Sequence, residues 1–129
     1  MRYLLDTHAV IWMRENDPRF SRIKWEPVLY SPGNEVCVSI VSLWEIAIKR
    51  ALGKLRFEGT LEDFAGTLET RQGFKLLQLE VPHLSHLEKL ERHHRDPFDR
   101  LLIAQAIETG AVAVTNDRDW RAYPVRMEW

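Results

Sequence analysis

Four acidic residues that are far apart in the sequence occupy the same kind of position. Asp6, Glu45, Asp99 and Asp117 each lie just after an apolar, strand-like segment or in the first turn of an expected helix. The carboxyl ends of parallel strands meet at one edge of a sheet, which is where ligands bind in open α/β folds. Each side chain alone could cap a helix, but together they would repel one another unless a cation lay between them.

A hard divalent cation with oxygen ligands, Mg²⁺ or Mn²⁺, is the simplest partner for such a group. The sequence has no Cys/His set for zinc, no glycine-rich phosphate loop and no Gly-x-Ser-x-Gly motif. A phosphatase would need an Asp-x-Asp pair after the first strand, where this chain has Asp6-Thr7-His8. An all-carboxylate site suits phosphodiester hydrolysis, in which the metal activates water and stabilises the leaving oxygen. We therefore expect the four acids to be metal ligands and catalytic residues.

The stretch 94–106, HRDPFDRLLIAQA, predicts the start of a buried helix. Asp96 is expected to cap it, and Pro97 fits the first helical position. Asp99 lies one turn into a mostly apolar helix, where an ionised carboxylate is costly without a cation. Capping is therefore the better interpretation for Asp96, and metal binding for Asp99.

The histidines and the cysteine do not extend this set. His83 and His86 share a helix face, but no cysteine or acid stands at matching spacing, so both are expected at the surface. His93 and His94 are interpreted in the same way, although they adjoin the 94–106 stretch. Cys37 is the only cysteine, lies in an apolar run and is expected in the core.

The alternation of short apolar runs with helical patterns predicts an α/β fold. Ser42 and Glu45 have the spacing of a capping box, and Gly53 is expected to end that helix. The expected strands are 3–5, 35–40, 74–79, 111–115 and 124–129. The expected helices are 8–14, 42–53, 82–93 and 97–109, with a helical segment inside 54–73 and a linker or short helix over 15–34.

Composition indicates an ordinary globular protein. The 129 residues are 45% hydrophobic and 29% charged, which fits one domain over 1–129 with a substantial core. The formal net charge of −1 argues against a passive nucleic-acid binder. No segment has the apolar length of a signal peptide or a membrane span, so a reducing, cytoplasmic compartment is expected.

The order of these motifs resembles that of the PIN-domain proteins, and in particular the VapC-type toxins of type II toxin–antitoxin pairs. The resemblance implies a PIN-like three-layer α/β/α sandwich with a central parallel sheet. It also implies an endoribonuclease that depends on Mg²⁺ or Mn²⁺, a small antitoxin partner and a homodimer. The segments that carry the resemblance are Leu4-Leu5-Asp6-Thr7-His8, Trp12, 39–49, 94–106 and Val114-Thr115-Asn116-Asp117.

By motif position, the resemblance assigns the acidic site to Asp6, Glu45, Asp99 and Asp117, with Thr115 as a supporting hydroxyl. Some relatives place the last acid further on, so Asp119 competes with Asp117; we prefer Asp117 because it lies closer to the strand end. The alternative from a different functional class is a catalytically silent PIN-like module that binds RNA or a protein. The presence of all four acids favours the nuclease.

Overall fold

The structure is a computed structural model that describes residues 1–129. Its strands are β1 (Arg2–Leu5), β2 (Glu35–Ser39), β3 (Lys75–Leu77), β4 (Val112–Val114) and β5 (Met127–Glu128). Its helices are α1 (Thr7–Arg14), α2 (Arg22–Leu29), α3 (Ile40–Ala51), α4 (Leu61–Thr70), α5 (Val81–Lys89), α6 (Pro97–Thr109) and the 3₁₀ helix η1 (Arg118–Ala122).

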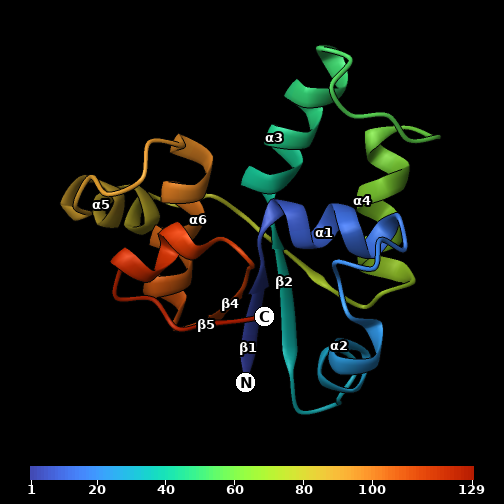
Figure 1. The fold of residues 1–129 in the computed structure, drawn as a ribbon, viewed down its shortest axis with the longest axis horizontal. Helices are drawn as coiled ribbons and strands as arrows, with labels where there is room; N and C mark the ends of the chain where they lie inside the picture. The colour runs from blue at the N-terminus through green and yellow to red at the C-terminus, as the bar shows by residue number, and fades with distance from the viewer.

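The five strands form one sheet in the order β3-β2-β1-β4-β5, and every neighbouring pair is parallel. β1 lies in the middle, so its carboxyl end has a strand end on each side (Figure 1). Leu5 pairs with Val38 of β2 and with Val114 of β4. The residues that follow these strands therefore meet at one edge of the sheet.

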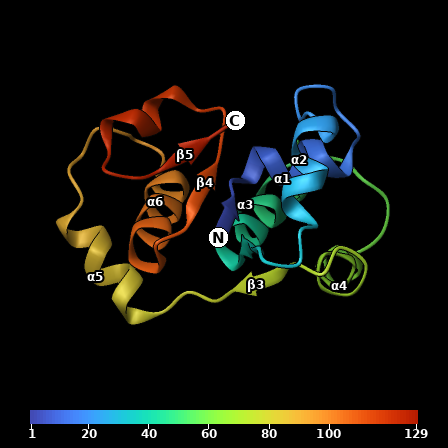
Figure 2. The ribbon, with the colours of Figure 1, turned by 90° about the horizontal axis from the view of Figure 1, so that it is seen from below.

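Alternating side chains of the central strands supply two cores, one on each face of the sheet. Tyr3 and Leu5 pack with residues of α1, α2, α3 and α4, whereas Leu4 packs with residues of α6 and η1. Figure 2 shows α1 to α4 on one side of the strands and α5 and α6 on the other. The predicted α/β/α sandwich with a parallel sheet is confirmed. Cys37 is buried in the second core, as expected.

Two local predictions need correction. α3 begins at Ile40 and is capped by Ser39, whose Oγ accepts a hydrogen bond from the backbone N–H of Val41, so Ser42 is not a cap. The helix predicted over 82–93 ends at Lys89. The short helix expected as one of two alternatives within 15–34 is confirmed as α2, in which Trp25 and Leu29 are buried. No helix has the length and apolarity that a membrane crossing requires.

Candidate functional site

Asp6 lies directly after β1 and is held rigidly at the carboxyl edge of the sheet. Its backbone N–H donates to the carbonyl of Val114 (3.1 Å), and its Oδ1 accepts from the N–H of Ala9 (2.7 Å). Thr115, which follows β4, donates its hydroxyl to Oδ2 of Asp6 (2.5 Å). Asp6 therefore caps α1 and is also one wall of the candidate site. Thr115 supports it as predicted.

Glu45 reaches the same region from the second turn of α3. Its side chain is 7% exposed, and Oε2 forms an ion pair with Nζ of Lys49 at 3.0 Å. Oε1 is buried and has no hydrogen-bond partner. A buried carboxylate oxygen without a donor is costly. It is therefore suited to a cation.

Asp99 comes from the first turn of α6. Asp96 caps this helix as predicted, because its Oδ1 accepts from the N–H groups of Phe98 (2.9 Å) and Asp99 (3.4 Å). Burial raises the pKa of Asp99 from 3.8 to about 7. The charges of Asp96, Glu45 and Asp6 add to this increase, and only His94 opposes it. Two of the predicted site acids, Glu45 and Asp6, thus repel a charge on Asp99.

Asp117 lies two residues beyond Thr115 and faces Asp6. Burial raises the pKa of Asp6, against the hydrogen bonds from Thr115 and Ala9, and the charge of Asp117 adds to the increase. A cavity of about 190 Å³ is lined by Asp6, His8, Trp12, Asn116 and Asp117, and we call it the acidic cavity. Glu45, Asp99 and Asp119 do not line it, but Asp119 differs from the other two because its side chain is 75% exposed. This arrangement supports the preference for Asp117 over Asp119.

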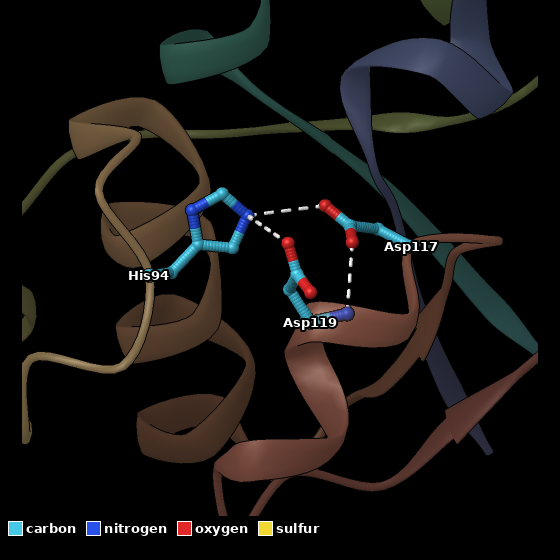
Figure 3. A group of neighbouring side chains, drawn as sticks. All are labelled: His94, Asp117 and Asp119. Carbon is cyan, nitrogen blue, oxygen red and sulfur yellow. Dashed lines mark hydrogen bonds and ion pairs between the residues drawn. The ribbon is translucent and has the colours of Figure 1, made fainter.

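His94 was predicted to be a surface residue, and this is wrong. Its side chain is only 11% exposed, and Nε2 lies 3.2 Å from Asp99, 3.1 Å from Asp117 and 3.9 Å from Asp119. Figure 3 shows the ring directed at the two aspartates on η1 and the turn before it. Only one group of three or more histidine, cysteine or acidic residues has all its possible metal-ligand atoms within 4.8 Å of one another. It consists of His94, Asp117 and Asp119.

The other ring nitrogen of His94 restricts what the imidazole can do. Nδ1 accepts a hydrogen bond from the backbone N–H of Asp96 (3.0 Å), so in the neutral ring the proton is on Nε2, toward the acids. Burial opposes the charged ring, but the hydrogen bond to Asp117 and the neighbouring aspartate charges outweigh it and raise the pKa of His94. Binding a metal through Nε2 would require a proton on Nδ1 and would break the bond from Asp96. His94 is thus arranged as a donor to carboxylates.

His83 was also predicted to be at the surface, and it is 4% exposed. Its Nδ1 accepts from the N–H of Glu80 (3.0 Å) and lies 3.4 Å from the buried amide of Gln105. His83 and Leu87 of α5, and Leu90 directly after it, pack inward, whereas Leu84 is 43% exposed. The imidazole of His83 therefore lies in the core, on the buried face of α5. His93 is exposed as predicted, and the half-buried His86 pairs with Glu108 of α6 at 2.7 Å.

The predicted site acids are side chains of the type that binds a hard divalent cation, although their oxygens do not all lie within 4.8 Å of one another as the ligand atoms of His94, Asp117 and Asp119 do. Asp6, Glu45 and Asp99 supply carboxylate oxygens, and Oε1 of Glu45 has no other partner. Such oxygens are the ligands that Mg²⁺ and Mn²⁺ prefer. Lys49 pairs with Glu45, and His94 lies beside Asp99, so both partly offset the negative charge of the acids. The positions of the acids in the sequence did not predict these two basic neighbours.

The raised pKa of Asp99 predicts how stability changes with pH in metal-free buffer. Between about pH 4 and pH 7 the unfolded chain loses the proton that folded Asp99 keeps. The free energy of unfolding should therefore fall as the pH rises through this range, by up to about 4 kcal/mol from this residue. Asp99→Asn should remove this contribution and match or exceed the wild type in stability at pH 8. Urea unfolding at several pH values measures both effects.

Asp96→Ala is the matched control for this experiment. It removes a helix cap and should lower stability by about 1 kcal/mol. If Asp99→Asn unfolds the protein while Asp96→Ala leaves stability unchanged, the roles assigned to the two aspartates are reversed.

Comparison with known proteins identifies the relatives of this chain. The sequence model of the PIN domain matches residues 3–125. No curated protein matches the sequence. Among solved structures, a VapBC2 complex from Rickettsia felis bound to promoter DNA superposes with a TM-score of 0.77 at 17% identity, covering 100% of this chain and 99% of that chain.

Two further solved structures have the same fold. DNA-bound VapBC from Salmonella typhimurium gives a TM-score of 0.70 at 20% identity, covering 99% of this chain and 97% of that one. VapBC-5 from Mycobacterium tuberculosis gives a TM-score of 0.58 at 18% identity, covering 98% of this chain and 95% of that chain. The resemblance found in the sequence is confirmed, and the fold is the one seen in these toxin–antitoxin complexes.

Proposed function

Because this chain belongs to the PIN domain family, we propose that it is a metal-dependent endoribonuclease and the toxin of a toxin–antitoxin pair. The observation that carries the proposal is the set of acids at the carboxyl edge of the sheet, with one buried glutamate oxygen lacking any partner. Incubating the purified protein with RNA in the presence of Mg²⁺, Mn²⁺ or EDTA tests it.

The proposed ligands of the cation are Asp6, Glu45 and Asp99, with Asp117 as the fourth acid. When bound, Mg²⁺ or Mn²⁺ supplies an activated water and neutralises charge on the leaving oxygen of a phosphodiester. The remaining work falls to the protein. It must hold the ligands at fixed positions and hold the RNA so that one phosphate reaches them.

Each acid has a neighbour that fixes its position. The hydroxyl of Thr115 and the N–H of Ala9 hold the two oxygens of Asp6. Lys49 holds one oxygen of Glu45 and leaves the other free. His94 joins Asp99 to Asp117, which come from different elements. We propose that His94 is a positioning residue that orients these two carboxylates.

Substitution of His94 should separate positioning from metal ligation. His94→Ala should weaken Mn²⁺ binding about 10- to 100-fold, the range typical of partners that orient a metal ligand. His94→Gln keeps an N–H donor near the position of Nε2 and should recover part of the affinity. Calorimetry measures the affinity, and pulsed paramagnetic resonance of bound Mn²⁺ should show no nitrogen coupling in the wild type. A strong nitrogen coupling would make His94 a ligand instead.

The proposed partners follow from the neighbouring structures and from the site. The solved relatives are toxin–antitoxin complexes, so we propose a small antitoxin that covers the acids with a basic side chain, and a homodimer of this chain. An RNA substrate places the protein in the cytoplasm, where the unpaired thiol of Cys37 stays reduced.

A further inference from the structure

A second cavity adjoins the acidic cavity and has a different chemical character. It measures about 350 Å³, lies between η1 and the end of β5, and its lining includes Arg118, Arg121 and Trp129. Asn116 lines both cavities, so they meet at this residue. Figure 2 shows that the chain returns from the η1 region to β5, which lies beside β4. We call it the arginine pocket.

The two arginines of this pocket are free to bind a ligand. Arg118 and Arg121 are exposed, and neither takes part in any hydrogen bond or ion pair in the structure. By contrast, Arg19 and Arg22 pair with acids on their own segments. Glu128 is the only acid in the pocket lining, so two guanidinium groups face one carboxylate. Guanidinium groups bind phosphate oxygens in a bidentate geometry.

The pocket also contains an aromatic ring held in place. Trp129 is half-buried and makes edge contacts with Trp12 (centroids 5.6 Å apart) and Phe20 (6.0 Å). Trp12 in turn lines the acidic cavity. Indole rings stack on nucleic-acid bases in single strands. Phosphate-binding groups and a stacking ring thus lie together next to the candidate metal site.

We propose that the arginine pocket is a nucleotide subsite, which holds the nucleotide adjacent to the cleaved bond of a single-stranded RNA. Arg118 and Arg121 bind its phosphate, and Trp129 packs against its base. The inference rests on the proposed function, because it takes the acidic cavity as the place of cleavage. A volume of about 350 Å³ falls within the range of small-ligand pockets. The net charge of −1 gives no general positive field that would attract RNA, so a local cluster of positive charge would contribute to binding.

Binding can be measured separately from cleavage. Wild-type protein in EDTA is titrated against a fluorescent single-stranded RNA of about 10 nucleotides, within the length that one such groove covers. We compare it with the double variant Arg118→Ala/Arg121→Ala. The matched control is Arg56→Ala/Arg71→Ala, which removes the same charge from two exposed arginines outside both cavities. Thermal unfolding verifies that each variant is folded.

The arginine pocket variant should bind RNA at least about tenfold more weakly, and the control should change binding less than about twofold. Loss of the contact with this one phosphate should make the slope of log K against log salt shallower by about 0.7. Trp129→Ala should weaken binding with the slope unchanged, and Trp129→Phe should restore it. Competition by inorganic phosphate at matched ionic strength distinguishes a nucleotide subsite from a simple anion site. At a simple anion site, inorganic phosphate would displace the fluorescent RNA as well as unlabelled RNA does.

Three results would overturn the subsite: equal losses in the pocket variant and the control, no RNA binding by wild type in EDTA, or full competition by inorganic phosphate. A different result would contradict the proposed nuclease function: RNA that binds through the arginine pocket but is not cut in the presence of any divalent metal.

Discussion

RNA incubated with the purified protein is expected to be degraded in Mg²⁺ or Mn²⁺ and to stay intact in EDTA. The reason is the mutual repulsion of the acids: Asp99 has its pKa raised to about 7 by burial and by the charges of Asp96, Glu45 and Asp6. A bound cation would favour the ionised form of these carboxylates together. Gel analysis of a mixed RNA pool, before and after adding excess metal back, measures the effect.

Variants at the site sharpen this experiment. Asp99→Asn should lower the cleavage rate by more than about 100-fold, since even partners outside the ligand set can cost that much. Asp117→Asn should be similarly impaired, whereas Asp119→Asn should keep most of the activity because that side chain is largely exposed and outside the acidic cavity. Full cleavage in EDTA would rule out the all-carboxylate mechanism. Equal loss in Asp119→Asn would move the fourth acid to that position.

Expression of the chain alone in a bacterial cell is expected to arrest growth, and Asp6→Ala is expected to be tolerated. Asp6 is buried at the centre of the sheet edge, and both its oxygens are held by donors from α1 and from Thr115. Its loss removes a rigid anchor of the proposed cation. Growth curves after induction measure the effect, with soluble protein quantified in both strains.

Asp6 also caps α1, so a second variant is needed. Asp6→Asn keeps an oxygen for the N–H of Ala9 and should be folded, yet it should also be tolerated by the cell. Co-expression of the proposed antitoxin should restore growth of cells that express the wild-type chain. If Asp6→Ala and Asp6→Asn both arrest growth as strongly as wild type, toxicity does not depend on the metal site. The silent interaction module then becomes the better description.

Much of this protein can be predicted from local pattern. The short, continuous apolar runs of β1, β2 and β4 reflect a sheet buried on both faces, and they identify these segments as strands. Because all strands are parallel, residues after the strand ends must share one edge. This geometry is why Asp6 and Asp117 could be placed near each other from sequence spacing. The cap at Asp96 depends on adjacent residues and was equally predictable.

The contacts that depend on tertiary packing could not be predicted in this way. Ser39 rather than Ser42 starts α3, because the strand leads into the helix without a loop. His83 enters the core because α5 turns that face toward α6 and the buried Gln105. His94 looked like one of two exposed histidines, and it lies among acids because the segment before α6 passes beside η1, which is 23 residues further along the chain. Sequence periodicity determines which way a side chain faces within its own helix or strand, whereas its partners are determined by how separate elements pack.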